Sequence, residues 1–135
     1  MQIELHSRYG APMAGKHNMM FGVIYLFLAM GLGLFLPEGV VAKNLSTAFI
    51  QANIDSALNI VAGYLIYRLP FMGWVSKTVS ILMIAGALLH SGALYLAAFG
   101  VLPSASMAMP LGVVILASVM LFMGIGALSI KVTSR

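Results

Sequence analysis

Residues 49–69 read FIQANIDSALNIVAGYLIYRL, an apolar run of helical length that polar side chains interrupt. A bilayer core about 30 Å thick is crossed by roughly 20 mostly apolar residues in a helix. This run has that length, Ser46 or Thr47 precedes it as a candidate N-cap, and Pro70 follows it as a stop. It is therefore predicted to be a membrane-spanning helix with an unusual polar content.

Three further apolar runs of similar length flank this one. They cover residues 19–36, 79–102 and 108–130. Pro37 and Pro103 follow the first and the third run, and the last begins near Ala108 or Pro110, since a proline is tolerated in a first helical turn. The sequence thus predicts an all-α membrane protein, a single domain over residues 1–135 built as a bundle of four transmembrane helices.

The composition agrees with this fold class. Only seven Lys+Arg and three Asp+Glu occur in 135 residues, 61% of the residues are hydrophobic, and the mean hydropathy is +1.04. In soluble domains about a quarter of the residues are charged. An ordinary soluble globule, a disordered chain and a nucleic-acid-binding protein are therefore excluded. With no cysteine, disulfides, thiolate metal sites and a cysteine nucleophile are excluded as well.

The few charges predict the orientation. With four spans, only Lys43 lies on one side of the membrane, and the other six basic residues lie on the opposite side: Arg8, Lys16, Arg68, Lys77, Lys131 and Arg135. The positive-inside rule then places both termini in the cytoplasm. The competing account of the first run is a cleaved signal peptide ending near Ala42, but its apolar stretch exceeds the usual 7 to 15 residues.

The polar side chains of the second run form a stripe. Gln51, Asp55 and Asn59 are four residues apart and share one helix face, and Asn53 and Ser56 widen it. These amides are candidate substrate-binding residues, with interhelical hydrogen bonding as the alternative. Asp55 is the only acid predicted inside a span, where an ionisable group costs about 3 kcal/mol or more. Without a cation beside it, burial favours the neutral carboxyl. Asp55 is therefore a candidate catalytic proton donor.

The third run supplies candidate partners for Asp55. His90 lies near its middle, and Tyr95 follows about one and a half turns later. A histidine at this depth could act as a general acid or base, bind a haem or metal ion, or serve as a hydrogen-bonded structural residue. These three roles stay open. His90 and Tyr95 join Asp55 as candidate catalytic residues.

Short motifs along the chain carry a resemblance to a known family. They are AGKHNMMF (14–21) before the first span, ANIDSALN (52–59) within the second, LPFMGWVSKT (69–78) after it and LYL (94–96) in the third. Together with the four spans, they resemble the hydroxylaminobenzene mutases and their relatives, the styrene oxide isomerases. These are small membrane enzymes of bacteria. The resemblance covers most of the chain and implies a bacterial inner (cytoplasmic) membrane location.

The resemblance also implies site residues. The family motif in the second span is similar to A-H-x-x-x-A-L-N, so that Asn59, together with Tyr95 of the third span, would contact substrate. In the epoxide isomerases the histidine of this motif ligates haem b, and here that position is Asn53. A haem, if bound, would need His90 or His17 as a substitute ligand; otherwise Asp55 would supply a proton in place of a metal.

The function that the resemblance implies is an isomerase of nitroaromatic degradation. It would convert hydroxylaminobenzene, an arylhydroxylamine, into 2-aminophenol by moving a hydroxyl group from nitrogen to the ring. Such a rearrangement involves no net redox change and requires no diffusible cofactor. The alternatives are a haem-dependent epoxide-to-aldehyde isomerase and a non-catalytic membrane subunit. The expected partners are a small aromatic substrate, the lipid bilayer and further copies of the chain, in a homo-oligomer that the resemblance suggests is a trimer.

Overall fold

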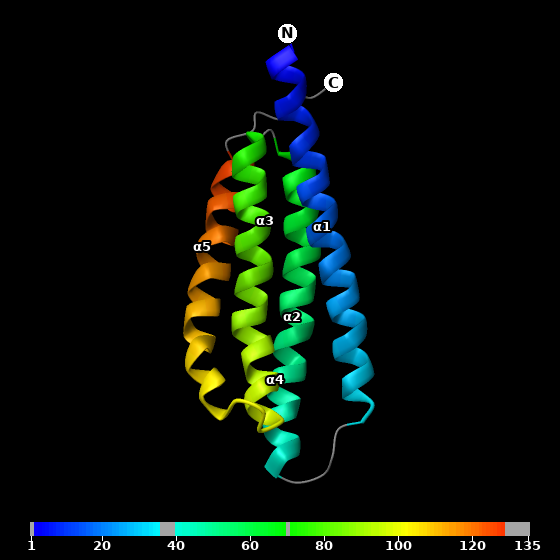
Figure 1. Cartoon of the computed structure of the whole chain (residues 1–135), viewed down its shortest axis with the longest axis vertical. Helices are drawn as coiled ribbons and strands as arrows, with labels where there is room; N and C mark the ends of the chain where they lie inside the picture. Colours follow the sequence, from blue (N-terminus) through cyan, green and yellow to red (C-terminus); the bar gives the residue numbers. More distant parts are fainter. Residues whose placement is uncertain (1, 36–39, 70, 129–135) are drawn as a thin grey trace.

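The protein is a bundle of four long helical rods that run up and down beside one another (Figure 1). The computed structural model describes residues 2–35, 40–69 and 71–128, with side chains from residue 13 onward except at 40–42. Within these ranges there is no strand. The all-α fold with four helices that the sequence predicts is confirmed.

The rods differ in how continuous they are. The first two are the single helices α1 (Gln2–Gly33) and α2 (Val40–Arg68). The third consists of α3 (Gly73–Ala87), a π-helical turn (Leu88–Gly92) and α4 (Ala93–Ala98). The fourth consists of a 3-10 helix (Pro103–Ala108) and α5 (Met109–Leu128). The predicted start of the last helix, near Ala108 or Pro110, is therefore correct.

Two helical segments of the described chain are long and apolar enough to cross a membrane. They are Gly73–Ala98 and Pro103–Leu128. α2 has the length to cross, but Gln51, Asn53, Asp55 and Asn59 lower its mean hydropathy. That all four rods cross a bilayer therefore stays a prediction.

The first two helices begin earlier than the sequence predicts. α2 begins at Val40 rather than after Ser46 or Thr47, and Thr47 Oγ1 donates a hydrogen bond of 3.0 Å to the Lys43 carbonyl within the helix. The N-cap prediction is therefore wrong. α1 likewise begins at Gln2 and not near residue 19. An apolar run marks the residues that can lie in the hydrocarbon core of a bilayer. The helix itself extends beyond this run wherever its backbone hydrogen bonds continue.

The third rod ends before the proline that was expected to stop it. Gly100, with a φ of 70°, adopts the left-handed conformation after α4. The amide of Gly100 donates to the Ala97 carbonyl at 3.1 Å, and the amide of Val101 donates to Leu96 at 3.1 Å. This is a Schellman motif. The helix therefore ends at Ala98 and not at Leu102, and Pro103 begins the next helix instead. Pro37 and Pro70, the other predicted stops, lie outside the described residues, as do positions 36, 129 and 130 at the predicted ends of the first and fourth spans.

Both described ends of the chain lie at one end of the bundle. α1 begins and α5 ends where α2 passes into α3 (Figure 1). Arg68 and Lys77 flank that connection, and Lys43 lies at the opposite end. The side chain of Arg8 and all of Lys131 and Arg135 lie outside the described part. Which end faces the cytoplasm stays a prediction.

Two glycines allow the backbones of α1 and α2 to touch. A Cβ atom on Gly63 would lie 2.5 Å from the Gly15 carbonyl oxygen, and one on Gly15 would lie 2.6 Å from the Gly63 carbonyl oxygen. Real Cβ contacts are longer, so any larger residue would push the helices apart. Small residues serve this purpose in membrane helix packing. The close contact fixes how the residues of α2 face the other helices.

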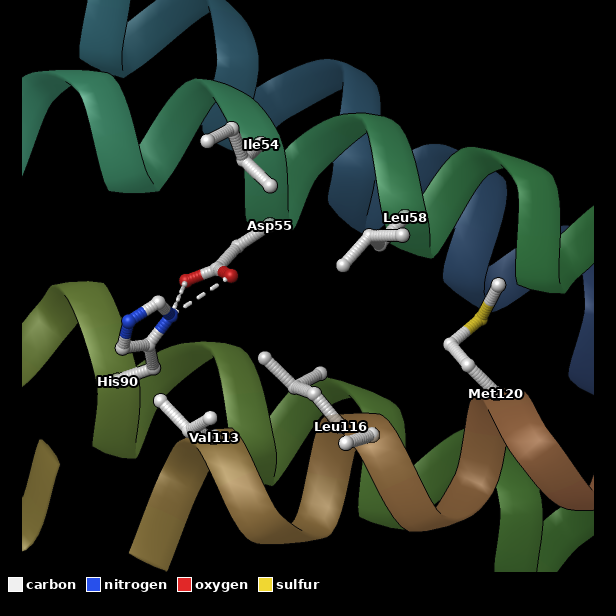
Figure 2. A pocket seen from close by; sticks show the side chains of 8 residues that line it. Ile54, Asp55, Leu58, His90, Val113, Leu116 and Met120 are labelled. Atoms are coloured by element: carbon white, nitrogen blue, oxygen red, sulfur yellow. Dashed lines mark hydrogen bonds and ion pairs between the residues drawn. The ribbon is translucent and has the colours of Figure 1, made fainter. Parts of the chain in front are cut away.

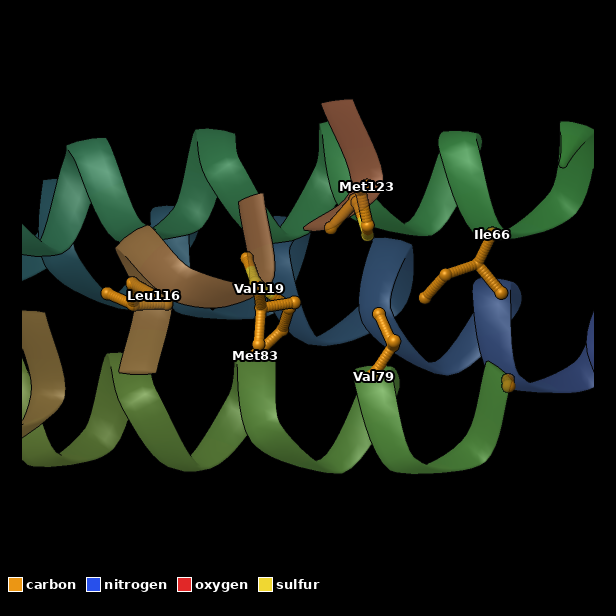
Figure 3. Close-up of a cluster of buried hydrophobic side chains, with 8 residues drawn as sticks. Ile66, Val79, Met83, Leu116, Val119 and Met123 are labelled. Carbon is orange, nitrogen blue, oxygen red and sulfur yellow. The ribbon is translucent and has the colours of Figure 1, made fainter. Parts of the chain in front are cut away.

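Two apolar clusters fill the bundle. The larger joins α1, α2, α3 and α5, and Figure 3 shows most of it: Ala14, Ala62, Ile66, Val79, Met83, Leu116, Val119 and Met123. The smaller joins α1, α2 and α4: Ala29, Leu45, Ala48, Ala52 and Tyr95. The polar residues of the interior lie between and beside these clusters.

Candidate active site

A set of buried polar side chains extends along the interior of the bundle. All are less than one-tenth exposed: Asn18, Asp55, Ser56, Asn59, Ser76, Ser80, His90 and Ser91. Asp55 is 1% exposed, and Ser56 and Asn59 are 0% exposed within a single chain. The polar face of the second helix therefore needs no second copy to cover these three residues. Self-association stays a prediction, and the trimer is what the resemblance suggests.

Asp55 and His90 form an interacting pair within this set. His90 Nδ1 lies 3.0 Å from Asp55 Oδ1 and 3.1 Å from Oδ2, and the two side chains point toward one another from α2 and the π-helical turn (Figure 2). From the sequence, His90 is a candidate partner of Asp55, although the neutral carboxyl was derived for an acid with no cation beside it. The structure places an imidazole beside it, which can carry the positive charge that balances the carboxylate.

The geometry of the pair defines its proton chemistry. A carboxylate accepts the Nδ1–H of His90, which fixes the ring and leaves Nε2 as the nitrogen that can exchange a proton with another molecule. Nε2 lies on the side of the ring away from Asp55, and no described residue makes a hydrogen bond to it (Figure 2). With Nδ1–H donated to the carboxylate, Nε2 can take up a proton from another molecule and later release it. Such a pair can act as a general acid and base.

The π-helical turn and α5 together position His90. The amide of Ala93 donates to the Leu88 carbonyl, five residues earlier, which is the π-helical bond pattern. Gly112 of α5 lies directly against this turn: a Cβ atom there would lie 2.5 Å from His90 N and 2.7 Å from Gly86 O. Because Gly112 has no side chain, α5 packs against the backbone of His90.

A pocket adjoins the pair. Its volume is about 280 Å³, and it lies between α2, the π-helical turn and α5. Apart from Asp55 and His90 its lining is apolar: Ile54, Leu58, Val113, Leu116, Ala117 and Met120 (Figure 2). Ile54 is 48% exposed and Val113 is 41% exposed. The pocket therefore reaches the surface of the bundle at its side, between α2 and α5.

Asn59 lies one turn beyond Asp55 and connects three helices. Its Nδ2 donates to the Asp55 carbonyl at 3.0 Å and to the Met83 carbonyl at 3.3 Å, and its Oδ1 accepts from Asn18 Nδ2 at 2.8 Å. Ser80 Oγ donates to the Ala14 carbonyl in the same region. Asn59 does not line the pocket. In this structure it orients the helices around Asp55.

Asn18 is a residue of this network that the sequence argument missed. It was left one position outside the predicted first span, although α1 continues through it. Replacing Asn18 by Ala would leave Asn59 Oδ1 buried without a donor. We expect the free energy of unfolding to fall by about 1–3 kcal/mol, measured by thermal or denaturant unfolding in detergent. Asn44→Ala, at an exposed position of α2, is the matched control. Equal stability of the two variants would contradict the assigned hydrogen bond.

The other predicted site residues do not line the pocket. Tyr95 packs in the smaller apolar cluster with its hydroxyl buried and unbonded, and Asn53 Oδ1 is likewise buried with no hydrogen bond from the described residues. Gln51 is half-buried one turn before Asp55. Tyr25, which the sequence analysis did not single out, bonds through its hydroxyl to Ser91 Oγ at 2.9 Å and so ties α1 to the π-helical turn.

The residues present do not fit a haem. The position that corresponds to the haem-ligating histidine of the similar motif is Asn53, and the pocket beside His90 has a volume of about 280 Å³. A cavity of about 150 Å³ binds benzene, so this pocket matches one substituted aromatic ring rather than a macrocycle of four pyrroles. His17 is exposed and lies in another pocket, beside Lys77. Within the described residues no three His, Asp or Glu side chains form a metal-binding group.

Comparison with known proteins adds no further assignment. No protein family model, no curated protein and no solved structure matches the chain. The candidate site therefore rests on the residues and geometry described above, and the likeness to the mutases and isomerases rests on the short sequence motifs alone.

Proposed function

We propose that the chain is a multi-pass membrane isomerase that converts an arylhydroxylamine such as hydroxylaminobenzene into 2-aminophenol. The observation that carries the proposal is the buried Asp55–His90 pair in the wall of an apolar pocket. A proton-transferring pair in an otherwise apolar cavity suits a small hydrophobic substrate with one reacting polar group. The choice of this particular reaction comes from the sequence motifs that resemble those of the mutases.

The surface of the bundle supports insertion into a membrane. α5 exposes large apolar side chains along its length, among them Leu111, Val114, Leu121, Phe122 and Ile125. Soluble monomers rarely expose contiguous apolar patches larger than a few hundred Å². Lipid, with further copies of the chain, would cover this surface in the cytoplasmic membrane of a bacterium. A trimer, which the resemblance suggests, is part of the proposal.

The pair would act on the oxygen of the substrate. Hydroxide is a poor leaving group from nitrogen, and protonation allows the oxygen to leave as water. His90 Nε2–H or the Asp55 carboxyl would supply that proton, and the carboxylate would stabilise the charge on the ring of His90. The oxygen of a water molecule then bonds to the ortho carbon, one proton of that oxygen passes to the nitrogen, and the proton that the ortho carbon loses restores the pair. No proton or electron is gained or lost overall.

The pocket fits the substrate in size and in access. One benzene ring with a hydroxylamino group is larger than benzene but smaller than the cavity of about 280 Å³. Val113, Leu116 and Met120 would contact the ring from α5. Since the pocket opens beside Ile54 and Val113, a substrate dissolved in the bilayer would enter from the side without crossing water.

The purified protein in liposomes, incubated with phenylhydroxylamine, tests this function. We expect 2-aminophenol as the product, identified by chromatography and mass spectrometry, at a rate proportional to protein and absent from empty liposomes. Aldehyde from styrene oxide together with a Soret absorption band, and no aminophenol, would favour the haem-dependent epoxide isomerase instead. Turnover of neither substrate would contradict the proposed activity.

A further inference from the structure

A second pocket, of about 410 Å³, lies between α1 and α3, and no residue of α5 lines it. Its lining combines a lysine and a histidine with small and apolar residues: Met13, Ala14, His17, Lys77, Ser80 and Ile81. None of these residues lines the pocket of the Asp55–His90 pair. The proposed reaction does not use this pocket.

The basic residues of this pocket have no anionic partner among the described residues. Lys77 and His17 are both exposed, and neither makes an ion pair or a hydrogen bond to a described residue. The chain has only three acids, of which Asp55 is 1% exposed and bonded to His90. The side chains of Glu4 and Glu38 lie outside the described part. An anion from outside the chain would therefore be attracted to this pocket.

The rim of the pocket is apolar. Met13 and Ile81 are 61% and 66% exposed and lie on α1 and α3, on the two walls of the pocket. A ligand that satisfies both features has an anionic group for Lys77 and hydrocarbon for the rim. That combination describes an anionic amphiphile better than a free ion.

Aromatic residues place this pocket at the level of lipid headgroups. Trp74 precedes Lys77 by three residues on α3 and is 66% exposed. Tyr67, which is 56% exposed, is level with Gly15 next to the pocket, since a Cβ atom on Gly15 would lie 3.2 Å from Tyr67 N. Exposed Trp and Tyr gather at membrane–water interfaces, and basic pockets between membrane helices bind anionic headgroups there.

We infer that the pocket between α1 and α3 binds the phosphate headgroup of an anionic phospholipid. Lys77 and His17 contact the phosphate, and Met13 and Ile81 pack against the start of the acyl chains. The inference rests on the proposed insertion into a membrane and is independent of the isomerase chemistry.

The single tryptophan of the chain reports on this site, because Trp74 lies less than one turn from Lys77. The protein is reconstituted into phosphatidylcholine vesicles that contain either brominated phosphatidylglycerol or brominated phosphatidylcholine, and quenching of Trp74 fluorescence is measured. We expect phosphatidylglycerol to be preferred by about fivefold, the effect of one basic residue near a charged surface. Lys77→Gln should abolish the preference, and His17→Gln should reduce it.

Lys16→Gln is the matched control, since Lys16 is an exposed cation of α1 that does not line the pocket. It should keep the preference. An equal loss in Lys16→Gln and Lys77→Gln would overturn the inference, because the preference would then reflect overall charge. Loss of the preference on adding inorganic phosphate would assign the pocket to a soluble anion instead. Equal quenching by both lipids would overturn the lipid site alone, whereas no quenching by either would overturn membrane insertion.

Discussion

Replacing Asp55 by Asn is expected to lower the rate of 2-aminophenol formation by about 10²–10⁴-fold, the usual contribution of a positioned general acid or base. Asparagine keeps the size of the side chain and an oxygen that can accept the Nδ1–H of His90, which now lies 3.0 Å from Asp55 Oδ1. It removes the carboxylate that would stabilise a charged imidazole and the proton that the carboxyl could donate. Initial rates in liposomes measure the effect.

The partner variant and a control make this result specific. His90→Gln should cause a loss of similar size, and the double variant should be no slower than either single one, because residues that act as a unit are not additive. Thr47→Val, which removes an exposed hydrogen bond within α2, should keep the wild-type rate. Full activity of a folded Asp55→Asn protein would show that the pair has no part in the reaction.

Replacing Gly112 by Ala is expected to reduce both stability and activity. The new Cβ atom would lie 2.5 Å from His90 N and 2.7 Å from Gly86 O, and neither backbone atom can rotate away. α5 would have to move outward, or the π-helical turn would have to rearrange. Overpacking of this kind costs about 1–3 kcal/mol, so the melting temperature in detergent should fall. The displaced His90 should also lower the rate of turnover.

Gly124→Ala separates this contact from a general effect of alanine in α5. A Cβ atom on Gly124 meets no atom within 4 Å, so that substitution should leave the melting temperature and the rate close to those of the wild type. If Gly112→Ala behaved in the same way, α5 would not be in contact with the turn that carries His90.

The sequence predicts the number and order of the helices better than their ends. Four apolar runs are visible because each must be mostly apolar over about 20 residues. The start of α2 at Val40 was missed because its first residues include Lys43 and Asn44, which extend a helix but not an apolar run. The end of α4 was missed because Gly100 ends the helix through its backbone conformation, three residues before Pro103.

The candidate site was predictable only in its central residues. Asp55 and His90 stand out because an ionisable group inside a span is costly and needs a reason. Their contact depends on how α2 faces the third rod, which the close approach at Gly15 and Gly63 fixes. The apolar wall of the pocket could not be identified in advance, since Leu116 or Met120 does not differ in the sequence from any lipid-facing residue.

The π-helical turn has a consequence for changes in chain length. The buried stripe of α3 passes through Ser80, Met83 and Ala87 and would continue at position 94 in a regular α-helix, but the buried residues there are Ala93 and Tyr95, on either side of that position. One surplus residue is thus accommodated between Leu88 and Gly92. If one residue were deleted there, α3 and α4 would still present the same residues to the interior of the bundle. It would also leave one position on the inner face where His90 and Ser91 now occupy two, so we expect the shortened protein to lose either the Asp55–His90 contact or the Tyr25–Ser91 hydrogen bond.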